Sequence, residues 1–569
     1  MTGVEDTHGI ALAARALKRH YGLAGRVRRL HGELDQTFAV DADAGRFILK
    51  LMRPGCDPEL VALQCAALSH LAQAQPSLPL PHVVPDTAGH AVPCVDDDDG
   101  QPRLAWLQTR RPGRPLSALR PLEPALCRAV GALLGDAHAG LASFRHPAAD
   151  RPLRWNLMEA AWIGDELGAI EQRDRRRLIT RLHAHFVERV APALAALPTT
   201  VVHGDANTDN LLVDAGDAGP ALSGLIDFGD LCLAPRVCDP AIACAYAMMQ
   251  ADDPVAAAEA LIAGISARTA LDDDELALVF PLLLTRLAVS VTVSALEKRR
   301  RPDDPYVTIS EAPAWRLLET FAEPDLALLE GRLRLACGLA ACRGAGEGFF
   351  VSSDALAPVI DTATQPADAP VVDTSFESLA GGDDPLAVDI GHLSAWVERC
   401  RADSGADCVI GRYGEPRALY TSAGFGAPDD PLAPRRTRHL GIDLFAAAGT
   451  AISAPLAGTV VACGVAQAPL DYGGYVVLRH MPAQAAPFDT VYGHLDPDSL
   501  GALAVGSTLA AGVPFATLGA PSSNGGWPPH LHFQASRGLD RWLDGHTPPG
   551  VCRPADFAAM SQLCPNPAA

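Results

Sequence analysis

Several features that would place a chain in a specialised class are missing from this one. Its first 22 residues do not form a signal peptide, because Arg15 interrupts their apolar run and Lys18 follows it. We identify no stretch of about 18 apolar residues, so we expect no membrane span. These two absences together predict a cytoplasmic protein.

Motifs for disulfides, structural metal sites and P-loops are also missing. The 14 cysteines are scattered and include no Cys-x-x-Cys pair, which indicates reduced and mostly buried thiols. No G-x-x-x-x-G-K segment occurs, which excludes a P-loop kinase. The formal net charge of −21 repels phosphate backbones and anionic lipid, so we expect neither nucleic acid nor a membrane surface as a partner.

The composition that remains is typical of a folded, multidomain protein. Hydrophobic residues make up 48% of the chain and charged residues 20%, which excludes a disordered chain. A length of 569 residues exceeds that of a single ordinary domain. Abundant alanine, arginine and proline are typical of a bacterial gene with high GC content.

The hydrophobic pattern divides the chain into four parts and predicts a multidomain α+β protein. Residues 1–342 open with short strands and continue at helical spacing, which predicts a two-lobed fold with a small sheet and a large helical body. Residues 343–405 are expected to form a linker and connecting segment. Residues 406–550 show short β runs between glycines and prolines, which predicts an all-β domain, and residues 551–569 form a tail.

The first part carries a set of residues suited to phosphoryl transfer. Asp205 precedes Asn210 by five residues, which is the D-x-x-x-x-N spacing of a kinase catalytic loop. Asp227 ends an apolar run and begins Asp-Phe-Gly, where a carboxylate that binds a metal ion belongs. Lys50 ends a strand-like run and is suited to pair with ATP phosphates, and Gly32–Phe38 is expected to be the turn that covers them. A lone His-Gly-Asp is more often a turn, so the prediction depends on the order and spacing of the whole set.

These motifs resemble the aminoglycoside phosphotransferase and choline kinase-like superfamily, most closely its hydroxylysine kinase branch. The resemblance implies a protein-kinase-like fold with ATP and Mg²⁺ as cofactors. It makes Asp205 the catalytic base, Asn210 and Asp227 the magnesium ligands and Lys50 the phosphate-binding lysine. The glutamate that pairs with this lysine in the family is not evident, because Glu59 lies only near the expected position and Gln64 occupies it.

The third part carries a set of residues suited to bind zinc. His439 and Asp443 are four residues apart, and His530 and His532 are two apart. Residues separated by an even number share one face of a strand, so both pairs are predicted to face one centre from adjacent strands. His439, Asp443 and one member of the second pair would bind Zn²⁺. The remaining histidine, together with His494, would orient water and stabilise an oxyanion.

This stretch resembles the lysostaphin-type peptidoglycan endopeptidases, which have an antiparallel β fold. The resemblance makes His439, Asp443 and His532 the zinc ligands and His494 and His530 the catalytic histidines. Such peptidases are normally exported, whereas no export signal is evident here. The substrate is therefore either peptidoglycan or a cytosolic peptide or amide.

Taken together, the two sets predict a bifunctional enzyme that phosphorylates a hydroxyl on a small amine or amino acid, such as hydroxylysine or ethanolamine, and hydrolyses a peptide. Two alternatives stay open: an active kinase whose β domain only binds cell-wall peptides, and a phosphotransferase that modifies antibiotics. The order of the domains resembles the front of bacterial fusion proteins that end in a pyridoxal-phosphate enzyme. We therefore predict a separate pyridoxal-phosphate-dependent phospholyase as a partner.

Overall fold

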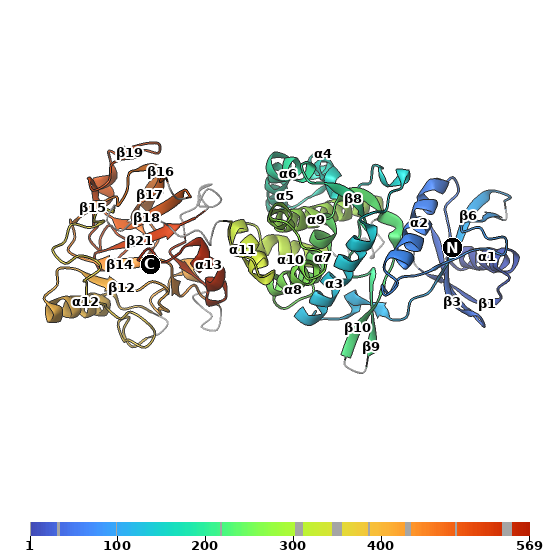
Figure 1. The fold of residues 1–569 in the computed structure, drawn as a ribbon, viewed down its shortest axis with the longest axis horizontal. Helices are drawn as coiled ribbons and strands as arrows, with labels where there is room; N and C mark the ends of the chain where they lie inside the picture. Colours follow the sequence, from blue (N-terminus) through green and yellow to red (C-terminus); the bar gives the residue numbers. More distant parts are fainter. Residues whose placement is uncertain are drawn as a thin grey trace. The chain divides into compact units, whose positions relative to one another are not determined.

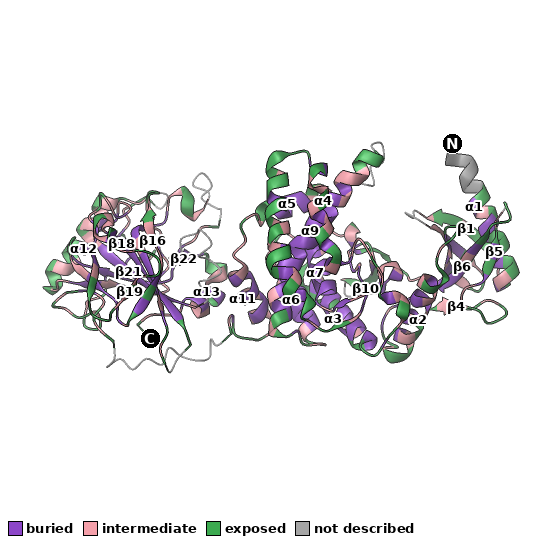
Figure 2. Cartoon of the chain, turned by 90° about the horizontal axis from the view of Figure 1, so that it is seen from above, coloured by how far each residue is buried: buried purple, intermediate pink, exposed green. Residues whose placement is uncertain are grey.

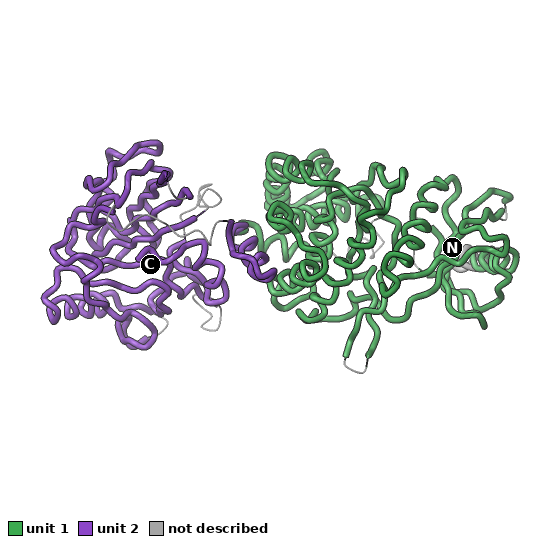
Figure 3. Tube along the Cα trace, viewed as in Figure 1, with its two compact units in different colours: residues 1–324 green, residues 325–569 purple. Residues whose placement is uncertain are grey.

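The computed structural model of the chain folds into two compact units, residues 1–324 and 325–569 (Figure 3). The described residues are 2–30, 35–97, 99–216, 219–301, 311–343, 356–384, 387–426, 434–483, 486–537 and 549–568, with the backbone alone for residues 2–7.

Unit 1 begins with a small antiparallel sheet covered by a helix (Figure 1). The strands follow the order β1-β2-β3-β6-β4, and β5 pairs with β6. Apolar side chains of β2, β3 and β6 form a core with helix α1. The elements are α1 (Thr2–Ala16), β1 (Gly25–Leu30), β2 (Gln36–Ala42), β3 (Gly45–Leu51), α2 (Pro58–Ala74), β4 (Val83–Val84), β5 (Cys94–Asp96) and β6 (Pro102–Thr109).

A larger helical body follows the sheet and confirms the predicted two-lobed, kinase-like fold. Its main helices are α3 (Pro124–Leu141), α5 (Arg173–His185), α7 (Cys238–Met248), α8 (Pro254–Ser266), α9 (Asp273–Arg300) and α10 (Glu311–Thr320). Its strands are β7 (Arg114–Pro115), β8 (Thr199–Val202), β9 (Leu211–Gly216), β10 (Gly219–Leu225) and β11 (Cys232–Pro235). Strand β8 pairs with β11, and β9 pairs with both β7 and β10. Val202 at the end of β8 is paired with Cys232 at the start of β11, so the loop after β8 lies beside the segment that joins β10 to β11.

Helix α9 corrects the prediction that the chain has no long apolar stretch. This helix has 28 residues and is apolar enough, by length and composition, to cross a membrane. The helix lies inside the fold, because 89% of its most apolar window is buried (Figure 2). An aspartate cap and Glu275 form a capping box at its start, so α9 has the features of a core helix.

Unit 2 is built on a seven-stranded antiparallel sheet in the order β12-β14-β21-β18-β17-β16-β19. This sheet confirms the predicted antiparallel β fold. Its strands are β12 (Val409–Gly411), β14 (Ile442–Phe445), β16 (Gly458–Ala466), β17 (Gly473–His480), β18 (Phe488–Leu495), β19 (Thr508–Leu509) and β21 (His530–Ser536). Two smaller pairs join β13 (Arg438–His439) to β22 (Val551–Cys552) and β15 (Ala451–Ser453) to β20 (Pro514–Thr517).

The segments expected to be linker and tail are packed parts of unit 2. Ile360 and Val372 of the expected linker are buried in its cores, as is one face of α12 (Ile390–Ser404). The expected tail contributes β22 and α13 (Phe557–Leu563), whose Met560 and Leu563 are buried. Helix α11 (Leu326–Ala336), assigned from the sequence to the first part, packs against α13. The chain therefore divides at residue 324 and not at 342.

All 14 cysteines are free thiols, as the scattered pattern predicted.

Candidate active sites

The loop after β8 holds the predicted phosphoryl-transfer base. The Asp205 carboxylate receives hydrogen bonds from the side-chain amides of Asn207 and Asn210, each at 2.8 Å. Its other oxygen lies 2.6 Å from the guanidinium of Arg286 on α9. Burial raises the pKa of Asp205 to about 6, although the charge of Arg286 lowers it. The structure therefore joins Asp205 and Asn210 in one hydrogen-bonded group.

A buried aspartate outside this loop fixes its backbone. Asp239, near the start of α7, accepts hydrogen bonds from the backbone amides of His203 and Gly204 at 2.9 and 2.8 Å. His138 of α3 lies 3.1 Å from the same carboxylate. Gly204 has a φ of +78°, and an added Cβ would lie 2.2 Å from the Asp230 carbonyl oxygen. Glycine is therefore required at this position.

The second predicted metal carboxylate lies across from the loop. Asp227 follows β10 in a left-handed conformation with a φ of 59°, which is rare for aspartate and typical of functional sites. The ammonium of Lys50 on β3 lies 3.0 Å from Asp227 and lowers the pKa of that carboxyl. Lys50, which the sequence assigns to the ATP phosphates, thus lies beside Asp227, which it assigns to the metal ion.

The expected lysine–glutamate pair and the expected phosphate-covering turn have different outcomes in the structure. No hydrogen bond or ion pair joins Lys50 to Glu59 or Gln64 within the described residues, because Gln64 donates to the Leu60 carbonyl inside α2. Among the described residues, the ion pair of Lys50 is with Asp227. Residues 31–34 of the expected phosphate-covering turn lie outside the described residues, and β2 begins at Gln36.

Sequence reasoning missed three residues of this site: Asp239, Asp230 and Arg286. Asp230 is a partly buried carboxylate whose pKa burial and neighbouring Asp205 raise to about 6. Only Arg286 had a clear sequence signal, because it is the one charged residue between Glu275 and Glu297 in an apolar helix. A charge in such a helix needs a buried partner.

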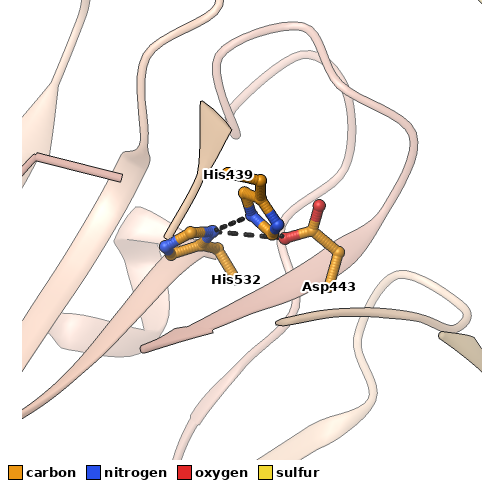
Figure 4. Close-up of side chains that lie close together, drawn as sticks. All are labelled: His439, Asp443 and His532. Carbon is orange, nitrogen blue, oxygen red and sulfur yellow. Dashed lines mark hydrogen bonds and ion pairs between the residues drawn. The ribbon is translucent and has the colours of Figure 1, made fainter. Parts of the chain in front are cut away.

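In unit 2, the three predicted zinc ligands converge on one point (Figure 4). His439 Nε2 and His532 Nδ1 are 3.0 Å apart, and each lies 3.2 Å from Asp443 Oδ1. One ligand atom from each residue lies within 4.8 Å of the others, and all three side chains are buried. The sheet register explains part of this geometry, because Asp443 of β14 is paired directly with His532 of β21.

The strand argument for His439 and Asp443 was only partly correct. His439 ends β13 and Asp443 lies in β14, so the two residues do not share one strand. Leu440 and Gly441 connect the two strands without belonging to either. The backbone at Gly441 passes close to the metal site, because an added Cβ there would lie 2.7 Å from the His532 ring. His439 and Asp443 therefore converge because the chain changes strand at Leu440 and Gly441. Their even spacing in the sequence does not explain it, since that argument holds only within one strand.

The outer atoms of the three ligands are also held in place. His439 Nδ1 lies 3.1 Å from the Arg412 carbonyl oxygen, and His532 Nε2 lies 3.1 Å from Gln534 Oε1. Arg417 donates to Asp443 Oδ2 at 2.5 Å. These contacts leave Nε2 of His439, Nδ1 of His532 and Oδ1 of Asp443 facing one another, as ligands of a common metal ion require.

The protonation states of His439 and Asp443 also fit a divalent metal ion. Burial lowers the pKa of His439 to about 4, so its ring is neutral at neutral pH. Burial would raise the pKa of Asp443, but the neighbouring His439 and Arg417 hold it well below its usual range. Neutral imidazoles and an ionised carboxylate are the forms that bind metal. A buried His₂Asp set with this donor chemistry fits zinc and leaves a position for water or substrate.

The two predicted catalytic histidines lie beside this set. The rings of His494 and His530 are 4.2 Å apart between centroids, and His530 Nε2 lies 3.8 Å from Asp443 Oδ1. Their Nδ1 atoms lie 2.9 and 2.7 Å from the carbonyl oxygens of Asn524 and Pro528. Nδ1–H donation to these carbonyls would leave Nε2 of each ring as the free acceptor. Burial lowers the pKa of both rings.

A cavity of about 240 Å³ opens onto all five residues. Its other walls are largely aromatic or apolar, with the charged side chains of Arg417, Arg436 and Asp471 among them. Wall residues include Leu419, Tyr420, Phe425, Leu470, Tyr472 and Trp527. The five residues therefore line one pocket with aromatic and apolar walls, and sequence reasoning missed both Arg417 and these walls.

Comparison with known proteins gives each unit a family. Residues 26–273 match the Phosphotransferase enzyme family, and residues 437–543 match Peptidase family M23. The chain therefore joins a phosphotransferase domain to an M23 domain. The M23 match covers the three metal-binding candidates and both catalytic histidines, and the phosphotransferase match covers Lys50, Asp205, Asn210 and Asp227.

Individual relatives match the phosphotransferase domain. Hydroxylysine kinase of Mus musculus is 25% identical over 317 residues, which cover 52% of this chain and 84% of that protein. Homoserine kinase of Pseudomonas aeruginosa is 29% identical over 296 residues, which cover 48% and 83%. Among solved structures, the amicoumacin kinase hAmiN is 15% identical with a TM-score of 0.44, covering 56% of this chain and 96% of that one.

Proposed function

We propose that the chain is a bifunctional enzyme, an ATP-dependent phosphotransferase joined to a zinc-dependent peptidase or amidase. The observation that carries the proposal is the intact geometry of both sets within one chain. Asp205 and Asn210 share hydrogen bonds while Asp227 meets Lys50, and His439, Asp443 and His532 converge on one point.

For the phosphotransferase domain we propose Mg-ATP as the donor and a hydroxyl of a small amine or amino acid as the acceptor. Mg-ATP would supply the phosphoryl group, with Lys50 on its phosphates and Asn210 and Asp227 on the metal. Asp205 accepts the proton of the acceptor hydroxyl while the hydroxyl oxygen forms its bond to the γ-phosphorus. The bond to the β-phosphate breaks and ADP leaves. Relatives named hydroxylysine kinase and homoserine kinase support this acceptor class.

The charge around Asp205 also favours an acceptor that carries an amine. Asp230 adds a partly buried carboxylate near the base, and its pKa is raised to about 6 by burial and by Asp205. A nearby ammonium group would offset this cost of burial. The alternative of an antibiotic acceptor makes the same demand, because aminoglycosides are also cationic, so the acceptor has to be tested directly.

For the M23 domain we propose hydrolysis of a peptide or amide bond. Zinc, when bound by His439, Asp443 and His532, would supply a Lewis acid for the scissile carbonyl. His494 and His530 would hold water, take its proton at Nε2 and return a proton to the leaving amine. The aromatic walls of the cavity are suited to the side chains of a peptide.

The test of the kinase uses purified protein, Mg-ATP and a panel of hydroxylysine, homoserine, ethanolamine and aminoglycosides, with products detected by mass spectrometry. We expect a phosphorylated amine or amino acid, lost in Asp205→Asn by a factor of about 10²–10⁴. A product from the aminoglycosides alone would support the antibiotic alternative.

The test of the peptidase uses zinc-loaded protein with peptidoglycan fragments and cytosolic peptides. We expect hydrolysis that His494→Ala lowers by about 10²-fold or more while the zinc content stays at one ion per chain. Peptide binding without hydrolysis in the wild-type protein would favour the alternative of a binding module. Localisation in the cytoplasm and a separate pyridoxal-phosphate-dependent phospholyase stay predictions; a purified phospholyase that consumes the kinase product would support the second.

A further inference from the structure

Helix α9 places one charge in the middle of an apolar core. Between Glu275 and Glu297 its one charged residue is Arg286, whose side chain is 2% exposed. Burying an arginine is costly unless a partner neutralises it and accepts its hydrogen bonds. The position of this residue therefore requires a specific explanation.

The partners of Arg286 are the predicted catalytic base Asp205 and two aromatic residues, Trp155 and Tyr246. Its guanidinium donates to Asp205 Oδ1 at 2.6 Å, which is the short distance of a charge-assisted bond. The group also lies over the ring of Trp155, 4.4 Å from the centroid. Two longer contacts, each 3.4 Å, reach the Trp155 carbonyl oxygen and the Tyr246 hydroxyl. Arg286 is thus held on several sides with its charge directed at Asp205.

The contact with Arg286 leaves the Asp205 carboxylate with few free acceptor positions. A carboxylate offers about four acceptor positions, two on each oxygen. Asn207 and Asn210 take both positions on Oδ2, and Arg286 takes one on Oδ1. One position on Oδ1 is left for the acceptor hydroxyl.

We propose that Arg286 is a positioning residue for the phosphoryl transfer: it fixes the rotamer of Asp205, so that Oδ1 faces the acceptor hydroxyl. Because Arg286 is itself buried, it acts through Asp205 and does not touch the substrate. This inference rests on the proposed kinase function and assigns a role to α9 in that reaction.

The experiment measures kcat and KM of the full-length protein with Mg-ATP and the best acceptor of the panel. Arg286→Met keeps the length of the side chain and removes its charge. We expect kcat to fall by about 100-fold, because a displaced base loses alignment with its hydroxyl, while KM for ATP changes by less than about threefold. Arg286→Lys restores the charge but not the planar set of N–H donors of the guanidinium. Its kcat should therefore lie between those of the wild-type protein and Arg286→Met.

A matched control comes from another ion pair that involves helix α9. Arg236 pairs with Glu275 at 2.6 Å at the start of α9, and that glutamate is buried. Arg236→Met should lower the urea midpoint and leave kcat within about twofold of wild type. The difference between the two variants separates a loss of alignment from a loss of stability.

A double-mutant cycle on the urea midpoint tests the contact without using activity. Arg286→Met should lower the midpoint less in the Asp205→Asn background than in the wild-type protein, because the pair acts as a unit. Equal losses in both backgrounds, or a wild-type kcat in Arg286→Met, would overturn the inference while the kinase function stands. A wild-type protein without any product would overturn both, since the inference depends on that reaction.

Discussion

At the residue scale, the two sites differ in how they hold their charged groups. The metal-binding candidates of unit 2 are all buried, and their outer atoms are tied to Arg412, Gln534 and Arg417. In unit 1, the Asp227 side chain is 53% exposed and its partner is the flexible Lys50. The M23 site is therefore preformed, whereas the phosphate side of the kinase site is open to a ligand.

The histidines of unit 2 have separable roles, which two variants can test. His532→Ala removes a metal ligand, so we expect the zinc content to fall well below one ion per chain and hydrolysis to be lost. His494→Ala removes a side chain beside the metal, so we expect zinc to stay bound and hydrolysis to fall by about 10²-fold or more. Elemental analysis and peptide cleavage on the same samples give both results.

His480 provides the matched control for these variants. It is buried in the same sheet and hydrogen-bonded to Thr490, and it does not line the pocket. His480→Ala should lower stability and keep both zinc and hydrolysis. A full zinc content in His532→Ala would contradict the proposed ligand set.

Sequence spacing predicted the residues expected to contact substrate or metal, but not the residues that fix the positions of those side chains. Asp205, Asn210, His439 and His532 occur in short motifs, so local order was sufficient to identify them. Arg417 pairs with Asp443 across 26 residues, and that pairing depends on β12 lying beside β14. Nothing in the local sequence indicates such a tertiary contact.

At the element scale, the start of α7 acts as an anchor for the catalytic loop. Asp239 accepts the amides of His203 and Gly204 while lying 1% exposed. Burial alone would raise the pKa of Asp239, but the bond from His138 and the other donors outweigh it and lower the pKa. The ionised carboxylate is therefore part of the folded state.

Replacing this anchor should destabilise unit 1. Asp239→Asn leaves the donors of His138 and the loop amides without their charged acceptor, so we expect a loss of about 3–5 kcal/mol in the free energy of unfolding. Asp41→Asn is the control, because Asp41 forms only a partly exposed pair with Arg110 at 3.9 Å, worth about 1 kcal/mol or less. Urea unfolding at pH 7 compares the two.

The same anchor predicts how stability depends on pH. The pKa of Asp239 is lower in the folded than in the unfolded state, so its contribution is present above the unfolded value of about 3.9. The contribution is lost as the pH falls from there through the folded pKa. The difference between wild type and Asp239→Asn should therefore shrink below pH of about 4. A difference that stays constant down to pH 3 would contradict the assigned ionisation.

Among the elements, the strands with alternating or apolar runs were predictable, and those defined by pairing were not. The apolar or alternating runs at residues 36–40, 47–51 and 475–480 predict strands from the sequence alone, and they form β2, β3 and β17 with small changes at the ends. Strand β1 is rich in arginine and was missed, because its position depends on pairing with β2. The two-residue strands β13 and β22 lack a local signal and exist only as partners.

At the scale of the whole molecule, the division at residue 324 has a consequence for fragments. Helix α11 contributes Ala327 to a core of unit 2, and Arg332 pairs with Asp556 at 2.9 Å with both side chains largely buried. The fragment 325–569 should therefore unfold at a higher temperature than 343–569, which lacks α11. Calorimetry of the two fragments makes the comparison. Equal midpoints would place α11 outside unit 2.

The two units should also respond separately to metal. Zinc stabilises only the fold that binds it, by about 2.7 kcal/mol when its free concentration is 100 times the dissociation constant. Chelation should therefore lower the unfolding temperature of unit 2 and leave that of unit 1 unchanged. Calorimetry of the full-length chain with and without a chelator would show this as a shift in one transition only.

The most direct test of the central claim is the mass-spectrometric yield of phosphorylated acceptor from Mg-ATP and the hydroxylated amine panel, measured in three proteins. We predict the same product from the wild-type protein and from His494→Ala, and none from Asp205→Asn. This result would establish a kinase that works independently of the M23 site. A product that persists in Asp205→Asn, or the absence of product from the wild-type protein, would contradict the account.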